Sequence, residues 1–344
     1  MLAACAKHAP TTGTQLPLQP ARAVMALTRA PLTKGTGPAL LVVDLPSRKT
    51  QTVALAASSL SAGNPRPAAL ATGTQNGLPW AFVLDSGSGA IAGFELSTGT
   101  LRGPNATDAL SDVIPNAIAA GRNALFAVSS DASSRASAIV WNANGAQRLT
   151  LFSDSALTAV CAAAVTSGFA AVAATGGAAE VVLLDATGVV LDRMALPGDS
   201  SMRPLACNGQ GDLLAVVTTG QFLTLSTKTG QLGSRVVAAL PAALALGTHP
   251  RLAVVGAQTA LATNRDITLL DNTTGTSAPL SLAEPGNVVA LAATPDSTSL
   301  LVGLGTGAEA TALVAWFFAQ REEIPVTRLG VDAGLVDIAV AAEP

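Results

Sequence analysis

Short apolar runs separated by polar turns fill the chain from about residue 20 to its end. The runs are rich in Val, Leu and Ala, and they stop at Gly, Pro, Asp, Asn or Ser. Runs of about four to eight such residues between turn residues are typical of short β-strands. Stripes with the 3.6-residue period of a helix are absent. The pattern therefore predicts an all-β protein.

A turn that ends in glycine recurs at a regular interval. The glycines lie at 99, 145, 188, 230 and 275, so the intervals are 46, 43, 42 and 45 residues. One further unit on each side, around Leu41–Leu45 and Ala315–Phe318, extends the series to seven. A period of this size is typical of a β-propeller. We predict seven blades of four strands; a β-sandwich or barrel with accidental turn spacing is the alternative.

The two ends of the chain complement each other. The first unit offers only three strands, at Ala23–Leu27, Ala39–Val43 and Thr50–Leu55, whereas Leu335–Val340 follows the last unit and matches an innermost strand. Pairing this C-terminal strand with the first unit would close the ring and remove an exposed sheet edge. We therefore predict one propeller domain over residues 21–344.

Composition agrees with a compact and nearly neutral body. Hydrophobic residues make up 49% of the 344 residues, charged residues 12%, and the net charge is −3. This charge gives no electrostatic footprint for DNA or RNA. No apolar run approaches the roughly 18 residues of a membrane-spanning helix. The expectation is a monomeric propeller that does not bind nucleic acid.

The N-terminus resembles a bacterial lipobox. Leu2-Ala3-Ala4-Cys5 has the small residues that precede a lipidated cysteine, although the basic and apolar parts of a signal peptide do not precede it. Residues 6–20 are polar and rich in Pro and Thr, which suits a flexible tether. We predict residues 1–20 to be a lipobox remnant and tether, and Cys5 to carry a lipid that anchors the protein in the cell envelope, at the outer membrane. A cytosolic protein with a chance match is the alternative.

Several repeats resemble those of known propellers. The segments ending at Gly188, Gly230 and Gly275 look like the strand and turn of quinoprotein-type (PQQ-like) repeats, and Thr294–Val302 is similar to the turn of YVTN-type surface propellers. Quinoprotein-type repeats usually carry a tryptophan after the glycine turn, and here small or aliphatic residues hold that place. With 3 Trp, 8 Phe and no Tyr, packing between blades should rest on Ala, Val and Leu, and we expect no quinone cofactor.

Candidate catalytic chemistry is sparse. The chain has two histidines, His8 in the tether and His249 in a turn, too few for a His-rich metal site or an imidazole pair. Gly303–Gly307 resembles a phosphate loop but lacks its lysine and following helix, so we interpret it as a strand connection. Cys161 and Cys207 lie in apolar innermost strands of neighbouring blades, where buried free thiols are favoured over a disulfide. We expect no cofactor or metal.

Acidic residues favour one face of the predicted ring. The connections between blades and the loops joining the second and third strands share a face, and Asp85 and Asp131 belong to the second set. The opposite face should receive Arg48, Lys49, Arg122, Lys228 and Arg251. Ordinary solvated turn acids are the alternative interpretation. The predicted partner-binding residues in the connections between blades are Asp108, Asp112, Asp154, Asp199, Glu284 and Asp332.

The sequence leaves two candidate functions. The first is a non-catalytic, lipid-anchored propeller of the cell envelope that binds or scaffolds an envelope protein or surface polymer through its loop face. The second is a propeller enzyme of the lactonase or quinoprotein dehydrogenase kind. The fold cannot decide between them. The residues favour binding, because such enzymes ordinarily place His, Arg, Glu or Trp at the centre of the ring.

Overall fold

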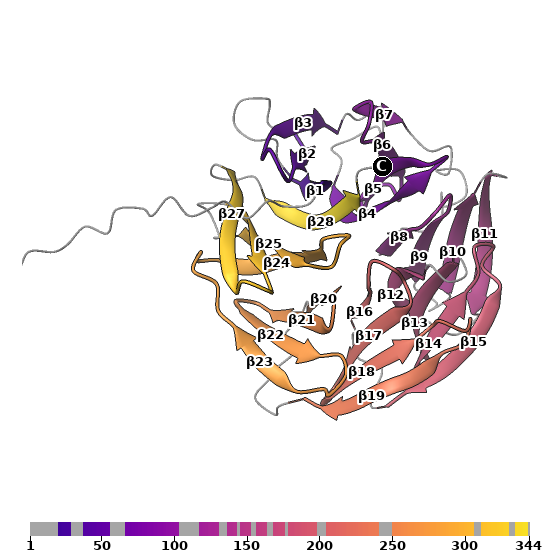
Figure 1. Cartoon of the computed structure of the whole chain (residues 1–344). Helices are drawn as coiled ribbons and strands as arrows, with labels where there is room; N and C mark the ends of the chain where they lie inside the picture. Colours follow the sequence, from indigo (N-terminus) through magenta and orange to yellow (C-terminus); the bar gives the residue numbers. More distant parts are fainter. Residues whose placement is uncertain are drawn as a thin grey trace, which may run out of the picture.

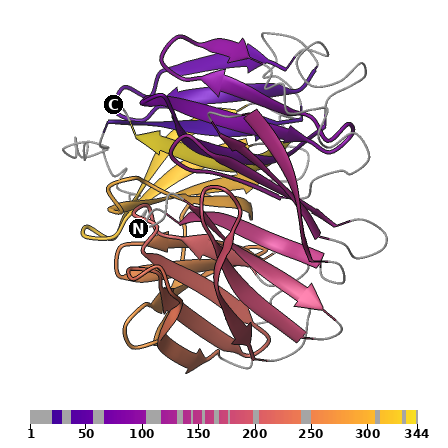
Figure 2. The same cartoon turned by 90° about the vertical axis from the view of Figure 1, so that its right-hand side faces the viewer.

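The fold is an all-β propeller, seen along its axis in Figure 1 and from the side in Figure 2. The computed structural model describes residues 20–28, 37–55, 66–102, 117–130, 136–142, 145–152, 156–163, 168–175, 178–197, 204–240, 250–305, 311–329 and 334–342. Within these ranges, 28 strands pair into seven four-stranded antiparallel sheets, here called blades 1 to 7. The prediction of an all-β propeller is confirmed.

In blades 2 to 7 the strands follow one another along the chain from the innermost to the outermost position, whereas in blade 1 the C-terminal strand is innermost. Blade 1 holds β28 (Leu335–Ala342), β1 (Ala21–Leu27), β2 (Ala39–Asp44) and β3 (Thr50–Ala54); blade 2 holds β4 (Pro67–Gln75), β5 (Leu78–Asp85), β6 (Ile91–Glu95) and β7 (Thr100–Arg102). Blade 3 holds β8 (Ala117–Ala120), β9 (Leu125–Ser130), β10 (Ala136–Asn142) and β11 (Gly145–Phe152); blade 4 holds β12 (Ala156–Ala163), β13 (Gly168–Thr175), β14 (Ala178–Leu184) and β15 (Val190–Leu196). Blade 5 holds β16 (Leu205–Cys207), β17 (Leu213–Thr218), β18 (Gln221–Ser226) and β19 (Gly233–Ala239); blade 6 holds β20 (Arg251–Val255), β21 (Gln258–Thr263), β22 (Asp266–Asp271) and β23 (Ser277–Leu280). Blade 7 holds β24 (Asn287–Ala293), β25 (Ser299–Gly305), β26 (Thr311–Phe317) and β27 (Glu322–Leu329).

The C-terminal strand closes the ring, as the sequence predicts. β28 pairs antiparallel with β1 in a register that sets Ala21 opposite Ala342 and Met25 opposite Ile338. Leu335 and Ile338 pack toward blade 7, whereas Ala339 and Ala341 pack toward blade 2. Figure 1 shows the yellow β28 beside the indigo β1, so both ends of the propeller meet in one blade.

Hydrophobic packing lies between blades. Each of seven hydrophobic clusters combines buried residues of two neighbouring blades. Ala, Val and Leu dominate them, as predicted, but phenylalanine contributes more than expected. Phe126 of blade 3 stacks on Phe169 of blade 4 with ring centroids 5.0 Å apart, and Phe82, Phe94 and Phe222 are also fully buried. Aromatic docking of blades is thus supplied by a few phenylalanines in place of tryptophan.

The recurrent turn glycines have a conformational reason to recur. Gly99, Gly188, Gly230 and Gly275 have φ angles of 70°, 85°, 73° and 74°. Residues with a Cβ adopt this left-handed region only at a cost, so glycine is favoured at each turn between the third and fourth strands. Gly303 and Gly305 behave differently, and Gly307 lies outside the described residues. Gly303 and Gly305 belong to β25, which corrects their assignment to a connection; a Cβ at Gly303 would collide with Leu335 and Ile338 of β28.

Candidate functional site

Most of the predicted site residues lie outside the described residues. These are the lipidation residue Cys5, the partner-binding residues Asp108, Asp112, Asp154, Asp199 and Asp332, and also Asp131 and His249. Glu284 is the one predicted partner-binding acid that the described ranges contain. Of the acids assigned to this face, the structure thus describes Glu284 and Asp85.

Glu284 is paired with an arginine of blade 7. It lies in the connection from β23 to β24, and its carboxylate forms an ion pair with Arg328 of β27 at 2.5 Å. The neighbouring Glu323 carboxylate accepts hydrogen bonds from the backbone N–H of Ala283 and, at 3.0 Å, of Glu284 itself. The Glu284 side chain is 21% exposed. Partner binding through Glu284 stays a prediction, and any partner would have to compete with Arg328.

Acids in the turns mostly cap their own turns. Asp85 is fully buried and accepts hydrogen bonds from the backbone N–H of Arg66 and Gly87. Hydrogen bonds from the backbone N–H of Thr274 and Thr273 hold the pKa of the Asp271 carboxyl below its usual range. This is the ordinary turn chemistry of Asp. Asp85 belongs to the loops assigned to the acidic face and Asp271 to a turn of the opposite face, so partner binding by the acids in the connections between blades stays a prediction.

The opposite face carries the predicted cations with one correction. Arg48 and Lys49 lie between β2 and β3, and Lys228, between β18 and β19, forms an ion pair with Asp212 at 3.3 Å. Arg251 is different, because it begins β20 and so lies on the side of the connections between blades. The placement of Arg251 on the opposite face is therefore wrong. The sequence pattern did not show which residue begins β20.

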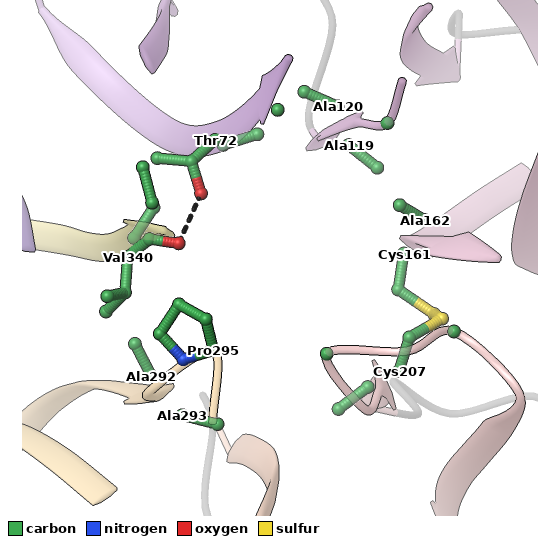
Figure 3. Close-up of a pocket in the computed structure, with 18 of the residues that line it drawn as sticks. Thr72, Ala119, Ala120, Cys161, Ala162, Cys207, Ala292, Ala293, Pro295 and Val340 are labelled. Carbon is green, nitrogen blue, oxygen red and sulfur yellow. Dashed lines mark hydrogen bonds between the residues drawn. A yellow bond between two sulfur atoms is a disulfide. The ribbon is translucent and has the colours of Figure 1, made fainter. Parts of the chain in front are cut away.

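The innermost strands enclose a central cavity of about 710 Å³. Figure 3 looks into it: small side chains such as Ala119, Ala162 and Ala292 line the wall around an open centre. Two of the polar side chains in the wall have partners within the protein. Thr72 donates to the backbone oxygen of Val340 at 2.8 Å, and the Asn208 amide is engaged by Asp212. Small side chains and backbone groups of the innermost strands therefore share the wall.

A disulfide forms part of this wall and corrects the prediction of free thiols. Cys161 of β12 and Cys207 of β16 are bonded, with their Cα atoms 5.6 Å apart. The bond joins the innermost strands of blades 4 and 5 and faces the cavity (Figure 3). The sequence placed both cysteines in neighbouring innermost strands. The distance between the two Cα atoms depends on the position of each cysteine along the ring axis. The sequence pattern does not give these positions.

Arg251 and Asp337 lie at one end of the cavity. Each comes directly before the first residue of its strand that lines the wall. Asp337 of β28 accepts hydrogen bonds from the backbone N–H of Leu70 at 3.0 Å and of Ile338 at 2.9 Å. Arg251 of β20 donates from Nε to the backbone oxygen of Val289 at 2.9 Å. Burial raises the pKa of the Asp337 carboxyl, against the opposing effects of its hydrogen bonds and of the Arg251 charge. Sequence reasoning missed Asp337, for which a charged residue within an apolar innermost strand was the signal, and it assigned Arg251 to the opposite face.

The shift at Asp337 has a consequence for stability. Because the pKa of Asp337 is raised in the folded state, ionising this carboxyl costs the folded protein more free energy than the unfolded chain. The cost is present at pH values above the ordinary pKa of 3.8 and vanishes at lower pH, where the carboxyl is protonated in both the folded and the unfolded state. We expect Asp337→Asn, which keeps an oxygen for the Leu70 N–H, to raise Tm relative to the parent at pH 8 and to lose this advantage at pH 3.

The matched control for this prediction has the opposite sign. In Asp185, burial is outweighed by hydrogen bonds from Thr187 and Val189, so the pKa of its carboxyl is lowered. Asp185→Asn should therefore lower Tm at pH 8, with a smaller effect at pH 3. Thermal melts followed by circular dichroism across this pH range measure both variants. An effect of Asp337→Asn that does not change with pH would contradict the assignment.

The described ranges contain neither a metal-ligating cluster nor a membrane-spanning helix. Among those residues, no group of three or more His, Cys, Asp or Glu is placed to hold a metal ion. A search of the same ranges finds no helix with the length and hydropathy to cross a membrane.

Comparison with known proteins supports the fold alone. No family model matches the chain, and no curated protein matches its sequence. Similar solved structures include a Lactobacillus plantarum protein (12% identity, TM-score 0.63, covering 94% of this chain and 100% of that one). Others are putative 6-phosphogluconolactonases from Bacteroides fragilis (12%, 0.64, 94% and 98%) and Bacteroides uniformis (13%, 0.64, 94% and 100%). The β-propeller domain of Cps50 (Swd1) from Myceliophteria thermophila is also similar (11%, 0.54, 86% and 92%). At such identities only the architecture is shared.

Proposed function

We propose that this chain is a non-catalytic binding or scaffold propeller of the bacterial cell envelope, anchored by a lipid on Cys5. Its partner would be an envelope protein or a surface polymer, held on the face that carries the connections between blades. The disulfide between Cys161 and Cys207 is the observation that carries the proposal. Disulfides persist in oxidising compartments such as the periplasm and the cell surface, and they are rare in the cytosol.

The architecture supports a binding role. Closure by β28 and packing at every junction between blades give a rigid frame, and rigid frames commonly present loops for recognition. The partner would meet several connections at once, because each blade contributes one to the same face. A pull-down from envelope extract with the propeller as bait identifies the partner.

The acidic connections give a test of the proposed face. Replacing Asp108, Asp112, Asp154 and Asp199 together with Asn should weaken partner binding, and added salt should weaken binding by the parent protein, because exposed charges are screened beyond about 8 Å at physiological ionic strength. Neutralising Arg48, Lys49 and Lys228 on the opposite face is the control and should change little. Affinity is measured with the captured partner by calorimetry. Loss of binding in the control variant alone would place the partner on the other face.

The lipid anchor is tested separately. With a complete signal peptide restored, the protein should be found in the membrane fraction and should incorporate radioactive palmitate. Cys5→Ala should be released in soluble form without label. Label that persists in Cys5→Ala would exclude lipidation at this residue while leaving the binding role open.

A lactonase is the second candidate function. Two of the structural neighbours are described as 6-phosphogluconolactonases of putative assignment, and Arg251 and Asp337 would offer a cation beside a carboxyl of raised pKa, groups suited to binding an anion and to acid-base catalysis. Hydrolysis of 6-phosphogluconolactone above the spontaneous rate, lost in Asp337→Asn, would favour the enzyme. A rate equal to the spontaneous one would favour the binding propeller.

A further inference from the structure

The innermost strand of each blade has one edge that faces the central cavity. The seven blades are separate four-stranded sheets, so each innermost strand pairs with a strand on its outer side only. Its other edge presents backbone N–H and C=O groups toward the cavity, whose wall every innermost strand helps to form. A buried backbone group without a partner costs free energy comparable to a lost hydrogen bond. A ligand of the cavity therefore has to satisfy these groups.

On one side of the ring, protein atoms already bond to this edge. The N–H of Leu70 bonds to the Asp337 carboxyl at 3.0 Å, and Thr72 donates to the backbone oxygen of Val340 at 2.8 Å (Figure 3). The backbone of Thr74 bonds through both its N–H and its oxygen to the turn between β8 and β9. The inner edges of β28 and β4 are thus partly satisfied from within the protein.

The ladder between β24 and β25 shows which groups of β24 face the cavity. Hydrogen-bonded and non-hydrogen-bonded pairs alternate along an antiparallel ladder. The N–H of Thr294 bonds to the Ser299 oxygen at 3.0 Å, so Ala292, two residues earlier, is also bonded toward β25. Leu291 and Ala293 are the alternate residues. Their N–H and C=O groups therefore point away from β25, toward the cavity that both residues line.

Arg251 of the neighbouring blade bonds to the same edge. Its Nε donates at 2.9 Å to the backbone oxygen of Val289, which lies two residues before Leu291. The inner edge of β24 thus accepts a hydrogen bond from outside its own sheet. Among the described residues, no hydrogen bond engages the cavity-facing backbone groups of Leu291 and Ala293. These two residues offer two donors and two acceptors to a ligand.

We propose that the cavity binds an extended peptide segment, which adds a strand to the inner edge of β24. The donors and acceptors on one edge of an extended peptide match those of Leu291 and Ala293, and addition of a strand to a free edge is a recurring mode of peptide recognition. The residues Ile338 to Ala342 line the wall in succession, a depth of about 13 Å at roughly 3.3 Å per residue. About four residues of the peptide would therefore lie within the ring. Small, uncharged side chains fit best, because a cavity of about 710 Å³ has to hold both the backbone and the side chains.

This inference rests on the proposed binding role and specifies the partner as a protein with an extended segment. The Asn variants of the connections between blades test the partner-binding face, whereas the experiments below test the cavity. Either can fail while the other succeeds. Binding in the cavity with no effect of the Asn variants would keep this inference and remove the acidic face.

The probe is the blocked peptide acetyl-Ala-Ser-Ala-Ser-Ala-Ser-amide, in two methylated forms that carry equal numbers of N-methyl groups. Three methyl groups on alternate residues leave one edge of the peptide able to pair, whereas three on consecutive central residues block both edges. In titrations followed by NMR, the alternate form should bind like the unmethylated peptide, and the consecutive form should bind at least about tenfold more weakly. Equal affinity of the two methylated forms, or no binding of the unmethylated peptide, would overturn the proposal.

Hydrogen exchange in the parent protein locates the added strand. Saturating probe should slow exchange of the Leu291 and Ala293 amides several-fold, because these N–H groups become hydrogen-bonded. The Leu252 amide of β20 is the internal reference. The two-residue turn after β20 bonds Val255 to Gln258, so Leu252 is at a non-bonded position of its ladder and also faces the cavity. Protection of Leu252 without Leu291, or of neither, would overturn the placement on β24.

Two proline variants form a matched pair. Leu291→Pro removes an N–H from the inner edge of β24 and spares the ladder with β25, and Leu252→Pro makes the same change on β20. Proline is tolerated where the N–H of an edge strand points away from the ladder. Leu291→Pro should weaken binding of the unmethylated probe about tenfold, and Leu252→Pro should leave it unchanged. Circular dichroism identifies folded variants, and the methylated peptides decide on the parent protein if Leu291→Pro does not fold. Undiminished binding in a folded Leu291→Pro would overturn the proposal.

Discussion

A protein that ends at residue 330 is expected to lose its closed ring and to aggregate, or to melt at a far lower temperature. The deletion removes β28 and leaves the inner edge of β1 unpaired over Ala21–Leu27. It also removes the buried side chains of Leu335 and Ile338, each worth about 1.5–3 kcal/mol when fully buried. An unpaired strand edge in a hydrophobic setting is a template for association with other chains.

Two controls make this result specific. Removal of residues 343–344 leaves β28 whole and should not change Tm. A synthetic peptide of residues 331–344, added in trans, should restore the monomer by pairing with β1, as strands do when they complete an open sheet. Size-exclusion chromatography and thermal melts measure all three. A truncated protein as stable as the parent, or one that the peptide does not rescue, would show that β28 is not the closing element.

The repeated turns made the architecture predictable. A glycine with positive φ ends the third strand of several blades, so the same sequence signal marks Gly99, Gly188, Gly230 and Gly275. Strand limits in the first blade were predicted within two residues, because polar runs separate its apolar segments. Closure of the ring was predicted from the number of strands. The first unit has one strand too few, and one further strand follows the last unit. These features are local in sequence or fixed by the number of strands.

The site features depend on contacts between blades, and this is why the sequence did not contain them in readable form. Asp337 meets Leu70 of the next blade, and Arg251 meets Val289 of another, across many residues of chain. Glu284 was predicted as a partner-binding acid, and Arg328 pairs with it from the outermost strand of blade 7. The heights of strands relative to the ring axis decide such pairs. Those heights follow from sheet twist and blade packing, which short apolar runs do not encode.

Loss of the disulfide is expected to destabilise the ring substantially. Cys161 and Cys207 are 46 residues apart, and closing a loop of that length in the unfolded chain corresponds to about 4 kcal/mol in the chain-entropy model. β16 pairs over only three residues, Leu205 to Cys207, so the bond also fixes the shortest innermost strand against blade 4. The double variant Cys161→Ser, Cys207→Ser should lower the free energy of unfolding by up to this amount, measured by urea denaturation.

Reduction of the parent protein separates the bond from the serine substitutions. Dithiothreitol should shift the urea midpoint of the parent toward that of the double variant and leave the double variant unchanged, because only the parent has a disulfide among the described residues. A shift in both would indicate that the reductant acts elsewhere. An unchanged parent midpoint after complete reduction, verified by thiol titration, would mean that packing of β12 against β16 holds blades 4 and 5 together without the bond. In that case the disulfide would not be needed for the stability of the ring.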